Sequence, residues 1–573
     1  MMNLRIILIL TLGCLLAGCD SFLDTGNYMK KDTGNFPSTQ DDAMQMTTGV
    51  YSVLKSQISY VRTSHFFVAE MAGDDRLGGG SRNNGESQAI DRLQYSEESQ
   101  FADFWRVTYS GIFRANSAIA TMDDVTDWNI PALKEQYLGE VYFLRALYYL
   151  QLVQVFGEVP LLLSPEAENK PKSPAAAIYA RIATDLLTAI ELLPAKPYHQ
   201  TESGRATRWA AQALLARTFL FFTGYYQQSE LPTVSSRLVT RNDVIAYLED
   251  CIGHSGHELV NDFRNIWAYA NKWTKPDYPY SLNNSLEWEG DGCKETVFAV
   301  KFGNHSRNES DKDALGYSNQ LCLNFGLRHP GSYNDAQCFP FGQGWAIGTI
   351  NPTLWEEWLQ DEPDDIRREG TILNQHTEMP PGWTTDRTKQ VEETGYWGKK
   401  YIPVLARDED GKIWKSYSCL AFGTAENYQT SHTNDLILIR LADVYLMHSE
   451  LTGTVGGINM VRARAGLAPV SSYSAQALKR ERRYELATEG LRWWDLLRWH
   501  EADATIPTNQ EGVPIKVIGT DYAYRSSFAL RFKKTGGFFP IPESQVLLSN
   551  GVLIQNTGWL AEDKDAYFEN LPY

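Results

Sequence analysis

The segment from residue 480 to residue 499 reads RERRYELATEGLRWWDLLRW and decides much of the expected fold. We expect two short helices that meet at Gly490, because glycine readily adopts the left-handed conformation that ends a helix. Trp493, Leu496 and Leu497 fall at i, i+3 and i+4 and give the second helix an apolar face. Arginine and carboxylate side chains are dense around the tryptophans, and an unpaired charge there would be costly. The segment therefore predicts a structural motif with paired, partly buried charges, and it contains no catalytic, metal-binding or phosphate-binding pattern.

The N-terminal residues predict export and lipidation. A single arginine precedes the apolar run of residues 6–12, and the sequence LAGC follows at residues 16–19. A positive start, a short apolar core and small residues before a cysteine are typical of a bacterial lipoprotein signal, and the run is too short for a spanning helix. We expect a signal peptide over residues 1–18, a lipid on Cys19 and a polar tether over residues 19–37. An ordinary secretory signal is the alternative.

The composition excludes some classes of function. The chain has 573 residues and a formal net charge of -17, which becomes -18 when a signal whose only charged residue is Arg5 is removed. This balance argues against nucleic acid as a partner, because phosphates need a basic surface. Aromatic residues make up 12% of the chain and suit a protein with flat stacking surfaces. No further apolar run approaches the roughly 20 residues of a spanning helix, so we expect attachment to the membrane by the lipid alone.

Five cysteines remain in the lipidated protein besides Cys19, namely Cys251, Cys293, Cys322, Cys338 and Cys419. An odd number in an oxidising compartment allows at most two intramolecular disulfides, and the spacing does not assign them. Cys251, His254 and His257 have metal-like spacing, but the glycines between them break any fixed face. The acidic stretch at residues 408–411 fits a hairpin turn better than a calcium loop. We therefore expect no cofactor and no metal at the functional site, while a structural calcium is left undecided.

Helical periodicity dominates the first half of the chain and its C-terminal part. We expect helices near residues 39–55, 101–122, 131–152, 174–193, 206–223, 435–451, 455–465 and 475–499. Between residues 260 and 430, Gly, Pro, Asn and Asp separate short apolar segments, which predicts loops with a few strands. Residues 401–406 and 413–417 are expected to form a β-hairpin. Nine of the sixteen tryptophans lie in this loop-rich region, so we expect some exposed indole rings.

Further motifs occur along the chain in a fixed order. They are FWR at residues 104–106, RAN at 114–116, EVYFLRALYY at 140–149, LIRLADVYL at 438–446, NMVRARA at 459–465, FPIP at 539–542 and QNTGW at 555–559. Together with residues 480–499, they resemble the SusD/RagB family of Bacteroidetes surface lipoproteins over nearly the whole mature chain. The resemblance implies a mainly α fold, in which a TPR-like helical scaffold carries a large loop-rich, partly β ligand-binding region. It also implies a SusD-like helical region at residues 38–259 and a RagB/SusD region at residues 260–573, with the binding segment at 260–430.

Two polar, glycine-rich segments are candidates for a sugar-binding site. A sugar ring has a C–H face that packs on an aromatic ring, and hydroxyl edges that Asp, Asn and Arg can bind. The segments are EMAGDDRLGGG at residues 70–80 and the stretch from LGY at 315–317 to FPFGQGW at 339–345. By the resemblance, the expected glycan-binding residues are Asp74, Asp75, Arg76, Tyr317 and Trp345, with Arg367, Tyr396 and Trp397 as further candidates.

Four of the candidates also have a structural interpretation. The two aspartates can cap a turn, Trp345 can occupy a core position, and Arg367 can form an ion pair with Asp364.

The resemblance implies a non-catalytic lipoprotein of the outer membrane that faces the cell exterior. It would capture an oligosaccharide or polysaccharide and deliver it to a SusC-like TonB-dependent transporter. One alternative keeps the fold but imports peptides or another nutrient, as in the RagB branch. A second alternative is a surface glycoside hydrolase, although the sequence has no GxSxG, HExxH or P-loop motif and no carboxylate pair stands out among seventy acidic residues. The sequence does not identify the glycan, its linkage or its length.

We predict that the substitution Cys19→Ala releases the protein from membranes, because it removes the residue that carries the acyl chains. Membrane fractionation after a high-salt wash measures this release. The matched control is Cys14→Ala, which lies inside the signal and should leave the protein membrane-bound. If Cys19→Ala stays with the membrane after the wash, lipidation at Cys19 is not the anchor.

Overall fold

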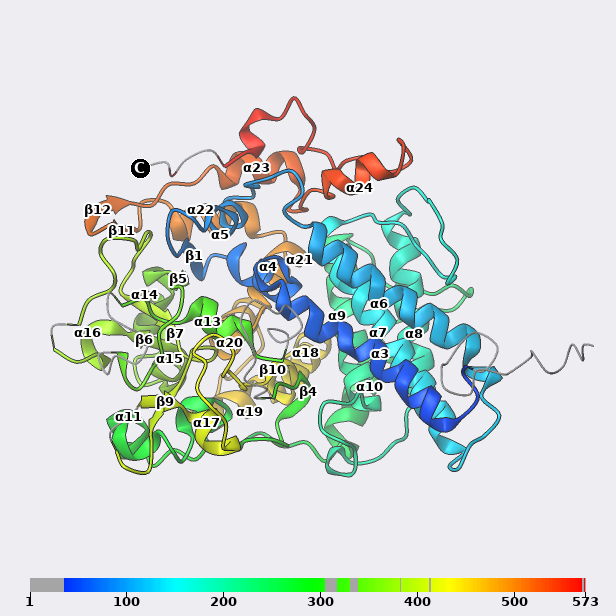
Figure 1. Cartoon of the computed structure of the whole chain (residues 1–573), viewed down its shortest axis with the longest axis horizontal. Helices are drawn as coiled ribbons and strands as arrows, with labels where there is room; N and C mark the ends of the chain where they lie inside the picture. Colours follow the sequence, from blue (N-terminus) through cyan, green and yellow to red (C-terminus); the bar gives the residue numbers. More distant parts are fainter. Residues whose placement is uncertain are drawn as a thin grey trace, which may run out of the picture.

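The computed structural model describes residues 36–303, 317–329, 338–381, 383–411, 414–568 and 571, except for the side chain of Trp414. The predicted signal peptide and Cys19 lie outside these residues. Helices make up the right-hand part of the molecule in Figure 1 and the C-terminal segments, as predicted. None of the described helices is long and apolar enough to cross a membrane.

The first half of the chain consists of long helices that pack on their neighbours in sequence (Figure 1). Threonines cap several of them, as at Thr39 and Thr240, where the hydroxyl accepts from the third residue of the helix and an aspartate completes a capping box. These helices are α3 (Gln40–Ser59), α6 (Ala102–Thr121), α7 (Ala132–Phe156), α8 (Ala175–Leu192), α9 (Arg208–Tyr225) and α10 (Arg241–His254). The short helices α4 (His65–Met71) and α5 (Gly85–Asp91) lie between α3 and α6 in sequence.

The C-terminal part is also helical. Its helices are α18 (Leu441–Thr452), α19 (Gly456–Arg464), α20 (Ala475–Leu486), α21 (Arg492–Arg498), α22 (Ala502–Gln510), α23 (Phe528–Thr535) and α24 (Glu543–Leu548). Helices α20 and α21 are separated at Gly490, which has a φ of 72° and therefore the left-handed conformation. The predicted pair of short helices is confirmed.

The middle of the chain contains short helices and irregular segments. The helices are α11 (Pro279–Asn283), α13 (Gln320–Phe325), α14 (Pro352–Asp361), α15 (Ile366–Thr371), α16 (Gln375–Glu378) and α17 (Tyr417–Phe422). Six antiparallel strand pairs occur among the described residues: β1 (Arg76–Gly79) with β5 (Ile347–Ile350), β4 (Thr296–Val300) with β10 (Leu436–Arg440), β11 (Pro514–Val517) with β12 (Thr520–Ala523), β2 (Leu231–Pro232) with β3 (Leu238–Val239), β6 (Ile372–Asn374) with β7 (Tyr396–Gly398), and β8 (Leu405–Arg407) with β9 (Trp414–Ser416). The predicted hairpin is therefore present in a shorter form, as β8 and β9.

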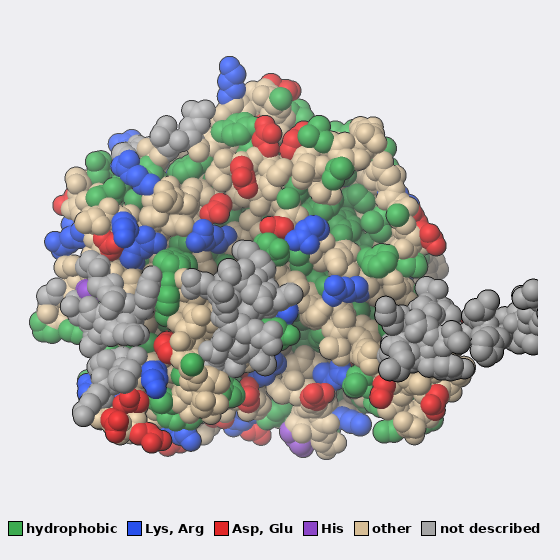
Figure 2. Space-filling view, in the orientation of Figure 1, with side chains coloured by type: hydrophobic (Ala, Val, Ile, Leu, Met, Phe, Trp, Pro, Cys, Tyr) green, Lys and Arg blue, Asp and Glu red, His purple; other side chains and the backbone are tan. Residues whose placement is uncertain are grey.

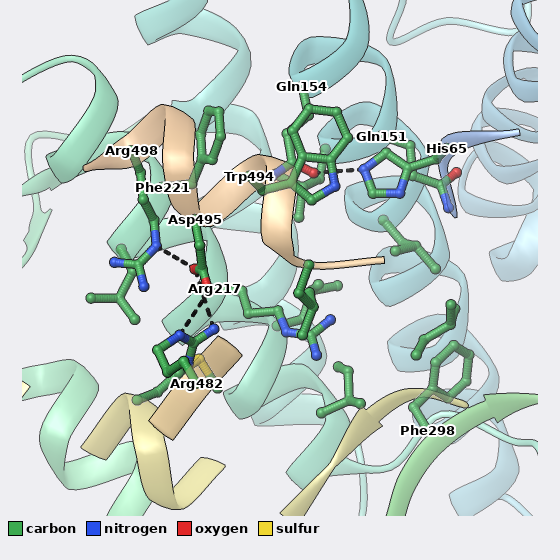
Figure 3. Close-up of a pocket in the computed structure, with 18 of the residues that line it drawn as sticks. His65, Gln151, Gln154, Arg217, Phe221, Phe298, Arg482, Trp494, Asp495 and Arg498 are labelled. Atoms are coloured by element: carbon green, nitrogen blue, oxygen red, sulfur yellow. Dashed lines mark hydrogen bonds and ion pairs between the residues drawn. The ribbon is translucent and has the colours of Figure 1, made fainter. Parts of the chain in front are cut away.

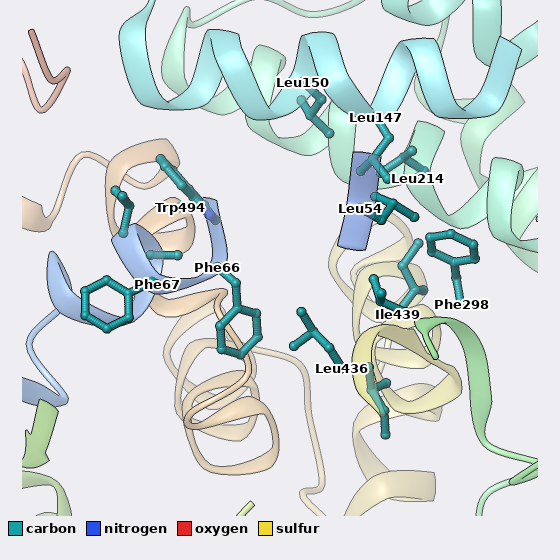
Figure 4. Close-up of a cluster of buried hydrophobic side chains, with 14 of the residues drawn as sticks. Leu54, Phe66, Phe67, Leu147, Leu150, Leu214, Phe298, Leu436, Ile439 and Trp494 are labelled. Atoms are coloured by element: carbon teal, nitrogen blue, oxygen red, sulfur yellow. The ribbon is translucent and has the colours of Figure 1, made fainter. Parts of the chain in front are cut away.

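One hydrophobic core joins the N-terminal helices to the C-terminal half. Figure 4 shows side chains from both halves in this cluster. Leu54, Phe66, Leu147 and Leu214 come from α3, α4, α7 and α9, whereas Ile439 comes from β10. Burial of apolar surface on this scale is the main contribution to folding, at roughly 25 cal/mol per Å². The two sequence regions divided at residue 259 thus share one core.

Because three of the five cysteines are free, at most one of the two disulfides that the sequence allows can form. Cys251, Cys293 and Cys322 are buried free thiols. Burial raises the pKa of Cys251 to about 12 and that of Cys293 to about 11, so both stay protonated at neutral pH.

Charged side chains are buried in a cluster around Arg440, at the end of β10. Its guanidinium lies 2.7 Å from Glu489 and 2.8 Å from Glu295, and it also pairs with Glu485. Burial alone would raise the pKa of Glu485, but the surrounding arginines, including Arg464, hold that pKa below its ordinary value. The expectation of paired and buried charges in the segment 480–499 is confirmed.

On the surface, charges of both signs are mixed. Figure 2 shows lysine and arginine side chains interspersed with aspartate and glutamate on the face drawn. The pair Arg106–Asp103 is a typical example, with the two side chains about half exposed and 2.9 Å apart. Such exposed pairs contribute little, because water screens them.

We predict that Arg440→Met lowers the free energy of unfolding by about 3–5 kcal/mol, because three carboxylates lose a buried partner. Arg106→Met is the control and should change the free energy of unfolding by less than about 1 kcal/mol. Denaturant unfolding of both variants beside the wild type measures the difference. Equal stability of the two variants would contradict a structural role for the buried cluster.

A small cavity of about 80 Å³ lies beside Trp494, where α4, α7, α9 and α21 meet (Figure 3). The His65 ring stacks on Trp494 at 4.8 Å, and its Nε2 lies 2.8 Å from Oε1 of Gln154. Arg482 and Asp495, which also line the cavity, form an ion pair at 2.9 Å. Burial lowers the pKa of His65 to about 4. The ring is therefore neutral in the folded protein at pH 7.

We predict that His65 makes the protein less stable as the pH falls from about 6.5 to about 4. In this interval the unfolded chain takes up a proton on His65 and the folded protein does not, so acid favours unfolding. His65→Phe keeps a flat ring beside Trp494 but cannot titrate. Free energies of unfolding at several pH values should decline less steeply for the variant than for the wild type. Identical slopes would show that His65 does not resist protonation.

Candidate ligand-binding site

The structure places the predicted acidic loop in the interior. Asp74 is completely buried and accepts from Nε of Arg492 at 2.7 Å and from the Asn509 amide at 2.7 Å. Asp75 pairs with Arg483 at 2.8 Å. These contacts fix the start of β1 to α20, α21 and α22. Because both carboxylates are covered by arginines from distant sequence, they are not part of the site that we propose.

Arg76 is also internal. It pairs with Glu70 at 2.6 Å, and its guanidinium lies 4.1 Å from the centre of the Phe325 ring. Arg76 also donates to the carbonyl of Gly348 in β5 at 2.5 Å. Its buried side chain therefore connects strand β1 to strand β5 and does not face a ligand.

Arg367 and Trp397 are likewise buried. Arg367 has no exposed surface and pairs with Asp365, Glu481 and Glu485. The structural alternative of an ion pair therefore describes Arg367 best, although the nearby partner is Asp365 and not Asp364. Trp397 is 1% exposed and donates from Nε1 to Gln375 at 3.3 Å.

Tyr396 is half-buried in a separate aromatic contact. Its ring packs on Trp355 at 5.4 Å, and Arg368 covers Trp355 at 5.1 Å. Both rings border the hydrophobic cluster around Trp358 and Tyr484. Tyr396 thus packs near Ile350, at the end of β5 that is farther along the chain from Trp345.

The expected exposure of central tryptophans is only partly found. Trp267, Trp358 and Trp397 are buried, and the rings that keep some exposed surface are Trp273, Trp288, Trp345, Trp355 and Trp383. Loops in this region pack against one another more closely than the sequence indicates. A ligand would therefore meet partial indole faces.

Trp345 is held on a rigid backbone. Its N–H donates to the carbonyl of Leu323 at 2.8 Å, and its own carbonyl accepts from Arg328 at 2.7 Å. The preceding Gly344 is required for this approach, because a Cβ there would lie 2.3 Å from the Leu323 oxygen. Tyr428 meets the indole edge to face, with ring centres 6.3 Å apart and planes at 78°.

Tyr317 lies near the same region. The adjacent Ser318 donates to the carbonyl of His432 at 3.3 Å, so its segment runs beside the loop that carries Tyr428. The Tyr317 ring is 41% exposed, and Nζ of Lys55 lies 4.1 Å from its centre. Of the eight ligand-binding residues predicted, Trp345 and Tyr317 both lie beside the segment of residues 428–432, Trp345 through Tyr428 and Tyr317 through its neighbour Ser318.

Arg328, which donates to the Trp345 carbonyl, and Gln343, two residues before Trp345, each carry a buried atom without a partner among the described residues, Nε and Oε1 respectively. A third such atom is Nε1 of Trp383. Gln343 donates its amide to the carbonyl of His329 at 3.1 Å, and the His329 ring lies 6.4 Å from Trp383. Burial lowers the pKa of Arg328. Buried polar groups normally find a partner, so these atoms offer hydrogen bonds to a ligand or to water.

We call Tyr317, Trp345 and Tyr428, with Arg328 and Gln343, the aromatic site. It offers ring faces for apolar contact and both donors and acceptors for hydroxyl groups. Tyr428 and Arg328 could not be predicted from the sequence, because no motif surrounds them and only tertiary packing brings them to Trp345. Among the residues that the structure covers, no group of three His, Cys, Asp or Glu side chains is arranged to hold a metal ion.

The fold and the aromatic site define a mainly helical scaffold that carries a partly exposed aromatic surface on irregular segments. A family model described as starch-binding and associating with the outer membrane matches residues 21–220, and a model of the SusD family matches residues 294–559. Together the two models cover most of the chain. The chain belongs to the SusD family.

Curated relatives align over almost the full length. A SusD-like protein of Bacteroides ovatus is 23% identical, and the match covers 95% of this chain and 96% of that protein. SusD-like protein P38 of Formosa agariphila is also 23% identical, over 87% of this chain and 92% of the relative.

Solved structures show the same fold. A laminarin-binding SusD-like protein superposes with a TM-score of 0.64 and 24% identity, over 91% of this chain and 99% of that one. Surface glycan-binding protein A from Bacteroides thetaiotaomicron, in complex with laminarihexaose, gives a TM-score of 0.67 and 19% identity, over 91% and 100%. The TPR-like architecture expected from the resemblance is confirmed at the level of the fold.

Proposed function

We propose that the protein is a non-catalytic receptor that binds an oligosaccharide or polysaccharide at the aromatic site. The observation that carries this proposal is that Trp345 keeps exposed surface and lies next to Arg328 and Gln343, each of which has a buried hydrogen-bonding atom without a partner among the described residues. A sugar ring needs both features at once, since its C–H face is apolar and its edge bears hydroxyls.

The chemistry of the site fits a neutral sugar. The C–H face of a pyranose can lie against Trp345, while Arg328 donates to a ring hydroxyl and Gln343 accepts from one. Tyr428 adds a second ring beside Trp345, and the segment of Tyr317 runs beside the loop that carries Tyr428. Lys55, above Tyr317, adds a cation that can donate to a hydroxyl oxygen.

The comparisons support the class of ligand. Proteins of the same fold are named as binding laminarin, or were solved with laminarihexaose or a xylogluco-oligosaccharide. The ligands of these proteins differ from one another, so the family points to glycans as a class and not to one polymer. Their names describe binding, which agrees with a receptor that leaves its ligand intact.

The proposed cellular role is capture at the outer membrane. The LAGC sequence at residues 16–19 supports a lipid anchor at Cys19, and one matching family model is described as associating with the outer membrane. In this arrangement the globular part faces the cell exterior and delivers its ligand to a SusC-like TonB-dependent transporter.

We predict that Trp345→Ala weakens glycan binding by about 1–3 kcal/mol, by analogy with the loss of an aromatic stacking platform. This is roughly a five-fold to more than hundred-fold increase in Kd. Affinity electrophoresis with a panel that includes laminarin, xyloglucan and starch first identifies a ligand. Calorimetry with that glycan then compares the variant with the wild type, and chromatography of the recovered glycan tests whether it stays intact.

Trp355→Ala is the matched control for this experiment. Trp355 is also a half-buried indole of the central region, but it contacts Tyr396 and Arg368 away from the aromatic site. We expect its affinity to equal that of the wild type. Wild-type affinity in a well-folded Trp345→Ala variant would exclude the aromatic site, and shortened glycan products would favour a hydrolase.

A further inference from the structure

A second pocket, of about 260 Å³, lies between β4 and the segment that connects α8 to α9. Its walls include Tyr198, Arg205, His257, Thr296 and Lys301. None of the five residues of the aromatic site lines it. The volume is just below the roughly 300–1,000 Å³ of pockets for drug-sized ligands, so it suits a single ring better than a chain.

His257 lines this pocket and carries an acceptor atom. Its Nδ1 lies 2.9 Å from the carbonyl oxygen of Lys294, and because a carbonyl only accepts, Nδ1 must carry the hydrogen. Burial lowers the pKa of His257 to about 4, which keeps the ring neutral at pH 7. The remaining nitrogen, Nε2, therefore bears a lone pair.

No donor among the described residues reaches Nε2 of His257, although the residue is only 5% exposed. A buried acceptor without a donor is unfavourable, typically by 1–3 kcal/mol. Because His257 lines the pocket, an O–H or N–H group of a molecule bound there can supply the missing donor.

Tyr198 fixes the histidine ring and provides a flat wall. The two rings are stacked, with centres 4.3 Å apart and planes at 17°. His257 is therefore held at one orientation by a ring contact on its face and a hydrogen bond at Nδ1. Such a site binds a ligand in one geometry without rearrangement of the acceptor.

The charged groups around the pocket are already paired. Lys301 pairs with Asp435, and Arg205 pairs with Glu140 at 2.8 Å and Glu202 at 3.1 Å. A charged ligand would have to compete with these pairs, whereas a neutral ligand would not. The hydroxyls of Thr201, Ser203 and Thr296 also line the pocket and can exchange hydrogen bonds with a polyol.

We propose that this pocket is a second binding site for a neutral, hydroxyl-bearing molecule of the size of one sugar ring, with one hydroxyl donating to Nε2 of His257. We call it the His257 pocket. It rests on the proposed function only for the choice of sugars as probes, because its chemistry is independent of Trp345.

Saturation-transfer NMR on the purified chain tests the proposal, with methyl β-glucoside, methyl β-galactoside and myo-inositol as probes. His257→Phe keeps the stacking ring and removes Nε2, so we expect at least about ten-fold weaker binding of the responding probe. Ser203→Trp fills the mouth of the pocket from an exposed position and should block binding without disturbing the core. Trp345→Ala should keep the signal, and both variants are made in that background, because sugar probes would otherwise also bind to the aromatic site.

A second readout follows the imidazole directly. In ¹⁵N spectra of histidine side chains, the Nε2 resonance of His257 should shift when a hydroxyl donates to it, and His254, which is largely exposed, should not shift. The proposal is overturned if no probe binds to Trp345→Ala, or if His257→Phe and Ser203→Trp in that background, folded as judged by melting, both bind as well as Trp345→Ala alone. Binding to the wild type with none to Trp345→Ala would leave the aromatic site as the single site and support the proposed function alone.

Discussion

The paired burial of Arg440 with three glutamates is the interaction on which the rest of the structure depends. These carboxylates come from the start of β4, from α20 and from the turn after it, so one guanidinium joins segments that are remote in sequence. Removing one partner from such a group strands the others in a medium of low dielectric constant. The arrangement fixes α20, and α20 presents Arg483 to Asp75 at the start of β1. Strand β1 pairs with β5, which begins two residues after Trp345.

Much of the helical fold could be predicted from the sequence, because helix periodicity, caps and the glycine break are local properties. The pair α20 and α21 was predicted from residues 480–499 alone, with their division at Gly490. The site could not be predicted in the same way. Asp74 resembles a surface acid in its glycine-rich loop, yet Arg492, which covers it, is 418 residues away in sequence. Whether a charged residue faces solvent or an ion pair is decided by tertiary contacts that no local pattern contains.

The same reasoning explains why Trp345 and Tyr317 remain candidates while their predicted companions do not. A glycine-rich turn before Trp345 is a local signal of close backbone approach, and the structure shows that approach at Leu323. Tyr428 has no such signal, since its loop meets Trp345 only through long-range packing. Arg367 was predicted both as a ligand contact and as an ion-pair partner. The structure pairs it with Asp365, which is two residues away in sequence, so this ion pair is a local feature that the sequence could reveal. Contacts between sequence neighbours could be predicted, whereas contacts between residues distant in sequence could not.

The backbone around Trp345 has a thermodynamic consequence. Its N–H and C=O are both engaged, and its turn is closed by a glycine that admits no larger residue without displacement. The loss of conformational freedom that a flexible loop would suffer on binding has here already occurred on folding. A ligand is then selected by the fit of its rigid shape to an existing surface. Glycans whose preferred backbone curvature matches that surface would bind with little loss of conformational entropy. Flexible chains of the same sugars would lose more of this entropy, because binding would fix them in one shape.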